Sequence, residues 1–259
     1  MSTFYRTHFD QIPEKSITNN CIVLDLDETL VHTFDEPRDL HKLNLLTNPA
    51  YHDLRERLYF LKLEDVVERK GTGVKSNLWG ITRPHVKEFL IFCFSYFKIV
   101  AVWSAGRQRY VDAIVNILFQ DIAKPHVTFS WKDCKVKGES LVGKPLSKMI
   151  ATVPGLSDHM SLKNTYILDD RLANFMENPG NGILIPVYDP DLSIKSIRRD
   201  DNHLLQFASW LQNPEVLQSE DLRSVKKTYI WSSPVCKLNS PCSLVIVKED
   251  ECKKEVVKV

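Results

Sequence analysis

The first 212 residues alternate between short apolar runs and amphipathic stretches. Residues 21–24, 98–103 and 164–168 are mostly apolar, a pattern typical of strands buried on both faces of a parallel sheet. Residues 86–97 and 203–211 carry apolar side chains three and four positions apart, which predicts a helix in each. Buried strands that alternate with helices predict an α/β fold with a central parallel sheet.

Further elements are predicted between and after these runs. Residues 35–49 are polar and contain proline, so we expect a loop there. Residues 58–63 and 78–82 predict the two strands of a hairpin, although helical spacing leaves residues 51–61 ambiguous. The other expected features are a helix with Val111, Ile114, Val115 and Leu118 on one face, strands at 126–131 and 182–187, and a polar, lysine-rich segment at 132–144.

The chain divides into three predicted parts. Residues 1–18 are expected to be a short, loosely held lead-in, residues 19–212 one α/β domain, and residues 213–259 a C-terminal extension of unknown role. Within the extension, residues 229–231 and 243–247 are predicted to be short strands or partner-binding segments.

Composition narrows the classes of function. Lys and Arg number 34 and Asp and Glu number 33, so we do not expect direct binding to nucleic acid. No Cys-x-x-Cys pair occurs, and Cys21 and Cys93 lie in apolar runs, which favours a reducing compartment. Residues 1–20 have no apolar signal core and no apolar run reaches 18 residues, so we expect an intracellular protein, nuclear or cytoplasmic, without a membrane span.

Asp25 and Asp27 follow the first apolar run and are the strongest candidates for chemistry. They would stand at the carboxyl end of a strand, where open α/β sheets bind their ligands. Two carboxylates placed there repel each other unless a cation or a shared proton relieves them. Taken alone, an Asp-x-Asp pair could equally cap a helix or brace a turn.

Two more strand ends carry suitable groups. Ser104, Ala105 and Gly106 lie between the second run and the next helix, where a hydroxyl and backbone N–H groups can bind an anion. Asp169 and Asp170 follow the third run, and an acidic pair suits a hard divalent cation. Right-handed connections would bring all three strand ends to one edge of the sheet.

These motifs together resemble the haloacid-dehalogenase (HAD) superfamily, and within it the RNA polymerase II C-terminal-domain phosphatases, or NLI-interacting-factor-like group. The resemblance is carried by Asp-Leu-Asp-Glu-Thr-Leu-Val from Asp25, by Arg-Pro-His-Val from Arg83, by Lys-Pro-Leu-Ser from Lys144, and by Asp-Asp-Arg from Asp169. It covers about residues 19–212 and implies a HAD-like, Rossmann-type, three-layer α/β/α fold with a small β-hairpin insertion after the first strand.

The resemblance also implies roles for individual residues. Asp25 would be the nucleophile and Asp27 the general acid and base. Ser104, with Ala105, would bind the phosphoryl group, and Lys144 would balance its charge.

A magnesium ion (Mg²⁺) would be the cofactor in this scheme. Its metal set would draw on Asp25, Asp169 and Asp170, with Asp27 contributing its backbone carbonyl. Asp170 would bind the metal while Asp169 orients its neighbours, although the sequence does not separate the two. Thr29 would help to hold the loop that carries the first two aspartates, beside the phosphate. Arg83 and Arg107 would contact the substrate.

The implied function is that of a Mg²⁺-dependent phosphatase for phosphoserine or phosphothreonine in a protein or peptide, acting through an aspartyl-phosphate. Two alternatives remain at this point. The same core could serve a phosphatase of small metabolites or of nucleic-acid 3′ ends, or a non-catalytic relative that binds phosphopeptides. The oligomeric state is not predicted.

Overall fold

The computed structural model describes residues 5–64, 73, 75–137 and 140–235. At the centre of this part of the chain lies a six-stranded sheet. Every neighbouring pair in it is parallel except the first, which is antiparallel. The strands in spatial order are β1 (Arg6–Thr7), β7 (Val127–Phe129), β6 (Ile99–Trp103), β2 (Cys21–Leu24), β10 (Thr165–Asp169) and β11 (Gly182–Leu184).

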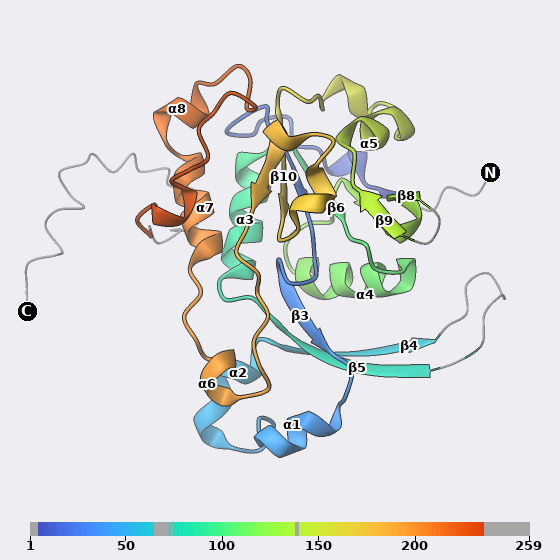
Figure 1. Ribbon diagram of the computed structural model, residues 1–259, viewed down its shortest axis with the longest axis vertical. Coiled ribbons are helices and arrows are strands. Elements are labelled where there is room, and N and C mark those ends of the chain that lie inside the picture. The colour runs from blue at the N-terminus through green and yellow to red at the C-terminus, as the bar shows by residue number, and fades with distance from the viewer. Residues whose placement is uncertain (1–4, 65–72, 74, 138–139, 236–259) are drawn as a thin grey trace, which may run out of the picture.

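Helices cover both faces of this sheet, which explains the unbroken apolar runs. Along β2, Ile22 and Leu24 face one core cluster, whereas Cys21 and Val23 face another. The first cluster includes α3 (Val86–Tyr96), α4 (Gln108–Phe119) and α7 (His203–Leu211), and the second includes α5 (Leu146–Thr152). Figure 1 shows α3 and α7 on one side of the central strands and α5 on the other. The predicted α/β fold is confirmed.

A second, antiparallel sheet follows the first central strand. Its order is β3 (Val31–Phe34), β5 (Lys75–Thr82) and β4 (Leu58–Glu64). The predicted hairpin is present as β4 and β5, and β3 adds a strand that the sequence analysis missed. This inserted sheet lies below the central sheet in Figure 1.

Regular structure is present in the predicted loop, in the ambiguous stretch and in the lysine-rich segment. The predicted loop at 35–49 holds the helix α1 (Arg38–Leu43). This helix is six residues long and buries only Leu40, so its sequence shows no repeating pattern of apolar residues. The ambiguous stretch at 51–61 is a helix first, α2 (His52–Arg55), and a strand afterwards. The lysine-rich segment at 132–144 includes the paired strands β8 (Lys135–Lys137) and β9 (Ser140–Gly143).

Both ends of the domain extend further than predicted. Residues 1–18 are not a loose lead-in throughout, because β1 pairs with β7 and Phe9 packs against the second core cluster. Beyond residue 212, Val216, Leu222 and Ile230 are buried in the main core, so packing continues past the predicted boundary.

Residues 229–231 do not form a strand. Ile230–Ser232 is a 3₁₀ helix that packs on α7, where the Gln206 side chain donates to the Trp231 carbonyl at 3.0 Å. The predicted strand at 243–247 lies outside the described residues. The remaining helices are α6 (Ile194–Ile197), α8 (Pro214–Leu217) and the 3₁₀ helices Phe9–Gln11, Pro49–Tyr51, Trp131–Asp133, Leu156–Asp158, Leu172–Phe175 and Pro179–Asn181. Within the described ranges, no helix combines the length and apolarity needed to cross a bilayer.

Candidate active site

Three neighbouring strands deliver the candidate residues to one edge of the sheet. β2 lies between β6 and β10, with Leu24 opposite Val102 and Leu168. Asp25 follows β2 and donates its backbone N–H to the Leu168 carbonyl at 3.0 Å, so it stays in register with β10. The predicted convergence of Asp25, Ser104 and Asp169 at the carboxyl ends of adjacent strands is therefore present.

Lys144 connects two of these strand ends. Its side chain is fully buried, and Nζ donates to Asp25 Oδ1 at 2.5 Å and to Asp169 Oδ2 at 2.7 Å. Burial by itself would lower the pKa of Lys144, but the two carboxylates raise it, so the ammonium group stays charged. The hairpin of β8 and β9 ends at Gly143, one residue before Lys144, and so leads the chain back to this position.

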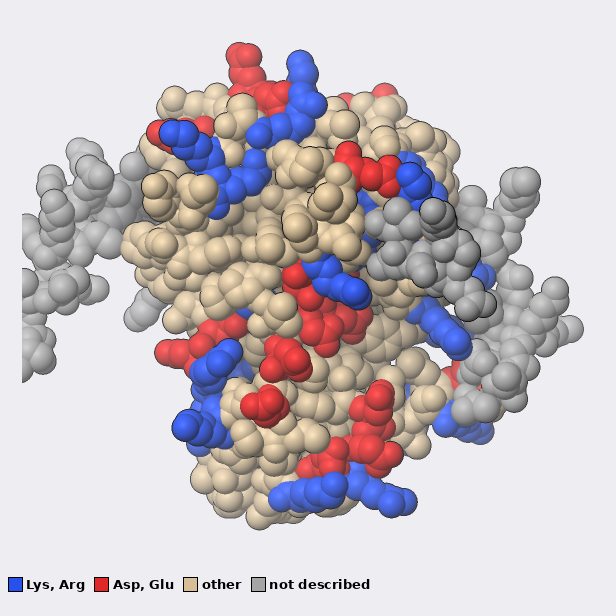
Figure 2. All heavy atoms as spheres, viewed as in Figure 1, with Lys and Arg blue, Asp and Glu red and all other residues tan. Residues whose placement is uncertain are grey.

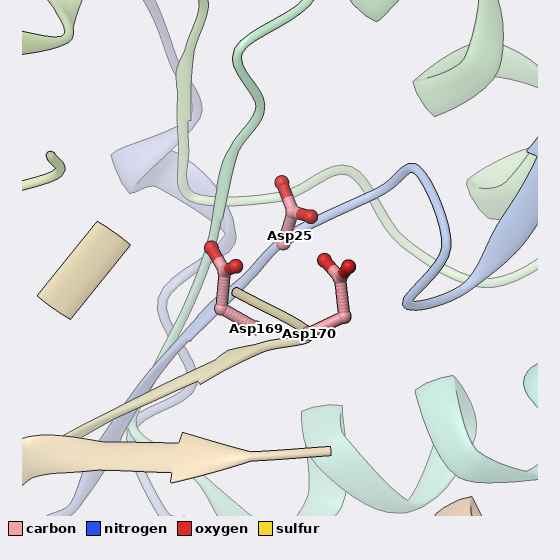
Figure 3. A group of neighbouring side chains, drawn as sticks. All are labelled: Asp25, Asp169 and Asp170. Carbon is pink, nitrogen blue, oxygen red and sulfur yellow. The ribbon is translucent and has the colours of Figure 1, made fainter. Parts of the chain in front are cut away.

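Asp25, Asp169 and Asp170 form a group that can hold a metal ion. One carboxylate oxygen from each lies within 4.8 Å of the others, and Figure 3 shows the three side chains projecting toward the same side. When all three are ionised, these carboxylates carry three negative charges, and the Lys144 ammonium balances one of them. The two that remain match the charge of one divalent cation. An all-oxygen donor set suits Mg²⁺. The residues therefore fit the predicted cofactor.

Asp169 and Asp170 differ in how their carboxylates are held. Asp169 accepts from Lys144, from the Asn174 side-chain amide at both oxygens, and from the Arg171 N–H at 2.9 Å. Asp170 is half-buried, and the Thr29 hydroxyl donates to its Oδ1 at 3.5 Å. Burial and the adjacent Asp169 raise the pKa of Asp170 to about 6. Asp170 is thus better able to turn toward a cation.

Asn174 is a site residue that the sequence analysis missed. It lies five positions after Asp169, in the short 3₁₀ helix Leu172–Phe175, and its own carbonyl accepts from the Lys144 N–H at 2.7 Å. It therefore braces both partners of the buried ion pair. No motif in the sequence marks it, because its role depends on the hairpin that returns Lys144 to the same place.

The Asp27 carboxyl group contacts Ser104 and Tyr110. Its Oδ2 lies 3.3 Å from Ser104 Oγ, and the Tyr110 hydroxyl donates to Oδ1. Burial raises the pKa of Asp27, which favours the protonated form that a general acid needs. The metal role predicted for Asp27 concerns its backbone carbonyl, and that role stays a prediction.

Ser104 lies between Asp27 and the start of α4. Its buried hydroxyl accepts from the Gly106 N–H at 2.9 Å, so the turn after β6 holds the side chain over the site. Ala105 is half-buried in the same turn, and Arg107 caps α4 and is exposed. Figure 2 shows acidic side chains gathered near the middle of the face that is turned toward the viewer.

A groove of about 700 Å³ opens beside Asp27. The inserted sheet forms one wall through Leu63 and Leu78, and the start of α4 forms the other through Arg107 and Tyr110. The remaining lining residues are Thr33, Asp35, Glu64, Ser76, Gly106, Gln108, Arg109, Trp131 and Lys132.

Arg83 is a correction to the predicted site. Its side chain is fully buried and donates to both oxygens of Asp201 at 2.9 Å, so it cannot contact a substrate in this arrangement. It also donates to the Thr29 carbonyl at 3.0 Å. The Thr29 hydroxyl in turn donates to Asp25 Oδ2 at 3.4 Å. Arg83 therefore braces the loop that carries the aspartates.

Comparison with solved structures shows the fold. The chain is similar to Fcp1, described as an essential RNA polymerase II CTD phosphatase, with a TM-score of 0.51 and 18% identity over 66% of this chain and 42% of that chain. A fission yeast Fcp1 variant bound to beryllium fluoride matches equally well, with a TM-score of 0.51 and 19% identity. The HAD-like fold is thereby confirmed.

The family follows from sequence. The family model described as NLI interacting factor-like phosphatase matches residues 20–223, and the chain belongs to this family. Among its relatives, Phosphatase PSR1 of Saccharomyces cerevisiae is 27% identical over 85% of this chain and 42% of that protein. A Probable C-terminal domain small phosphatase of Dictyostelium discoideum is 26% identical over 79% of this chain and 53% of that protein. The chain spans about half or less of these relatives' lengths.

Proposed function

We propose that this protein is a Mg²⁺-dependent phosphatase that removes phosphate from serine or threonine in proteins through an aspartyl-phosphate on Asp25. The observation that carries the proposal is the position of Lys144 between Asp25 and Asp169, beside three carboxylates that suit a divalent cation. The names of its relatives, which include CTD phosphatases, support a protein substrate.

The first step is attack by the Asp25 carboxylate on phosphorus. A bond forms from Asp25 to phosphorus, and the bond from phosphorus to the serine or threonine oxygen breaks. Asp27 gives its proton to that departing oxygen. Lys144 stabilises the negative charge around the transferred group, and the Ser104 hydroxyl with the N–H groups of its turn binds the phosphoryl oxygens.

The second step releases phosphate. Asp27, now ionised, takes a proton from a water molecule that attacks the phosphorus of the aspartyl-phosphate. The bond from Asp25 to phosphorus breaks, and both carboxyl groups return to their starting states. General acid and base help of this kind contributes about 10²- to 10⁴-fold to the rate.

The cation site would consist of Asp25, Asp170 and the Asp27 backbone carbonyl, with Asp169 holding Lys144 in place. When bound, Mg²⁺ neutralises charge between the carboxylates and the phosphoryl oxygens. The groove beside Asp27 supports a peptide substrate, since it offers apolar and basic walls to residues next to the phosphorylated one. Buried free thiols at Cys21, Cys93 and Cys134 support an intracellular location, nuclear or cytoplasmic.

A substrate panel tests this function. The wild-type protein and Asp25→Asn are compared on phosphoserine peptides, sugar phosphates and 3′-phosphorylated oligonucleotides, with Mg²⁺ present. We expect turnover of the peptides by the wild type and none by the variant. A preference for either of the other two substrate classes contradicts the proposed substrate. Tight peptide binding without turnover by the wild type would instead indicate a non-catalytic binding protein.

A further inference from the structure

A chain of hydroxyl groups links Asp27 to the inserted sheet. The Tyr110 hydroxyl hydrogen-bonds to Asp27 Oδ1, and Thr33 Oγ1 lies 2.6 Å from the Tyr110 hydroxyl. The same Thr33 oxygen lies 2.6 Å from the Tyr59 hydroxyl, which is also 3.2 Å from the His32 carbonyl oxygen. Tyr110 comes from α4, Thr33 from β3 and Tyr59 from β4. The catalytic acid is thus connected to two layers of the molecule.

Two glycines make room for this chain. A Cβ atom at Gly80 would lie 2.2 Å from both Cζ and the hydroxyl oxygen of Tyr59. A Cβ atom at Gly106 would lie 2.7 Å from Cδ1 of Tyr110. Contacts this short do not occur in folded proteins, so each ring can take its position only because its neighbour is glycine. The placement of both hydroxyls is therefore built into the sequence.

The two phenols are also partly or fully buried. Tyr59 is 4% exposed, Tyr110 is half-buried, and burial raises the pKa of both phenols, so they remain neutral hydrogen-bond donors. When Tyr110 donates to Asp27, Thr33 can donate to Tyr110 and Tyr59 can donate to Thr33. All three protons then point toward the carboxylate, and linked hydrogen bonds of this kind strengthen one another.

We propose that Tyr110, held by Thr33 and Tyr59, is a positioning residue that fixes the rotation of the Asp27 carboxyl group. With Oδ1 held by Tyr110, Oδ2 is the oxygen directed toward Ser104, where the departing substrate oxygen would lie. This inference rests on the proposed function, because it assumes that Asp27 protonates the leaving group. It adds three residues to the site that neither the motifs nor the metal set includes.

If Tyr110 positions Asp27, the effect of losing Tyr110 on the rate of the first step should depend on the leaving group. Serine oxygen leaves poorly unless it is protonated as its bond to phosphorus breaks, whereas the oxygen of an aryl phosphate leaves readily without help. A misaligned Asp27 therefore slows attack on a phosphoserine peptide more than attack on an aryl phosphate. None of the three hydroxyls lies in the proposed phosphate or metal site, so KM for the aryl phosphate, which does not fill the groove lined by Thr33 and Tyr110, should change little.

The experiment measures single-turnover release of the leaving group from both substrates by Tyr110→Phe, Tyr59→Phe and the corresponding double variant. For the peptide we expect Tyr110→Phe to slow release about tenfold or more, which matches the loss of one hydrogen bond to a carboxyl group. The aryl phosphate rate should fall less than about threefold, since acid help is then largely unnecessary. The double variant should be no slower than Tyr110→Phe, because both hydroxyls act through one path.

Matched variants separate the hydroxyl from the packing around it. Thr33→Ser keeps the hydroxyl and should retain the peptide rate, whereas Thr33→Val keeps the shape and should lose it. Tyr166→Phe is the control for deleting a buried phenol, because the Tyr166 hydroxyl has no hydrogen-bond partner among the described residues. We expect wild-type rates from it.

Two results would overturn the inference. Equal losses on the two substrates would mean that the variants disturb the whole site, and an additive double variant would mean that Tyr59 acts separately from Tyr110. Failure of the proposed function is recognised differently: Asp27→Asn would then release serine at the wild-type rate. The two failures are therefore distinguishable.

Discussion

The side-chain amide of Asn174 donates to both carboxylate oxygens of Asp169, at 2.8 and 2.9 Å. Because Lys144 also binds Asp169 Oδ2 at 2.7 Å, this carboxylate is already engaged within the protein. Its evident task is to hold the Lys144 ammonium against Asp25. Asp170, one residue further on, has no such set of strong donors among its described contacts, which is why we propose it as the metal ligand.

The two aspartates should therefore respond differently to the same substitution. We expect Asp170→Asn to weaken Mg²⁺ binding about tenfold or more, with the metal-free melting temperature unchanged or raised, because the variant removes a repelling charge. Asp169→Asn should lower that temperature, because it takes a partner from a buried lysine. Isothermal titration and thermal denaturation check both. Loss of Mg²⁺ binding in Asp169→Asn alone would reverse the assignment.

Metal binding should also stabilise the wild-type protein. A ligand that binds only the folded state adds about 2.7 kcal/mol at a concentration 100 times its dissociation constant. We expect the melting temperature to rise with Mg²⁺, and turnover to disappear on chelation and return when Mg²⁺ is restored. The proposed site at Asp25 and Asp170, which belong to the group of three carboxylates, would account for the effect. Full activity after exhaustive chelation would contradict the metal assignment.

Arg83 should matter for stability. Arg83→Met leaves Asp201 buried without its bidentate partner and removes a donor to the Thr29 carbonyl. Losing one member of a buried ion pair costs about 3–5 kcal/mol of unfolding free energy. Urea denaturation measures this loss. A variant with unchanged stability but a raised KM would mean that Arg83 contacts the substrate after all.

The ion pair of Arg83 and Asp201 should also make the stability of the protein depend on pH in acid. Burial alone would raise the pKa of Asp201, but hydrogen bonds from His203 and Arg83 outweigh it and hold the pKa well below its usual range. A depressed folded-state pKa adds stability that is complete above the unfolded value of about 3.9 and is lost as the pH falls below it. The unfolding free energy of Asp201→Asn should therefore depend less on pH below about pH 4 than that of the wild type. Parallel pH dependences in the two proteins would contradict this.

The parts of the fold and of the site that could be predicted from the sequence are those that depend on neighbouring residues in the chain. The apolar run before Asp25 marks a strand covered on both faces, and strand ends in a parallel sheet meet, so the acidic residues could be placed from sequence. Short elements such as α1 bury a single leucine and give no usable period.

The remaining parts of the site arise from tertiary packing. Asn174 depends on where the β8 and β9 hairpin returns Lys144, and Tyr59 depends on how the inserted sheet docks beside α4. Arg83 was misjudged for a similar reason: a motif arginine near the site suggests a substrate contact, whereas its buried partner Asp201 lies 118 positions away. Sequence spacing carries no record of such pairings.

The most direct test is to trap the transferred phosphoryl group. The enzyme is denatured in acid during turnover of a phosphoserine peptide and treated with borohydride, which reduces an aspartyl-phosphate to homoserine, and the peptides are then mapped by mass spectrometry. The account predicts homoserine at position 25 and unmodified Asp27, with no modification when substrate is omitted. Homoserine at another position, or rapid turnover without any trapped residue, would contradict it.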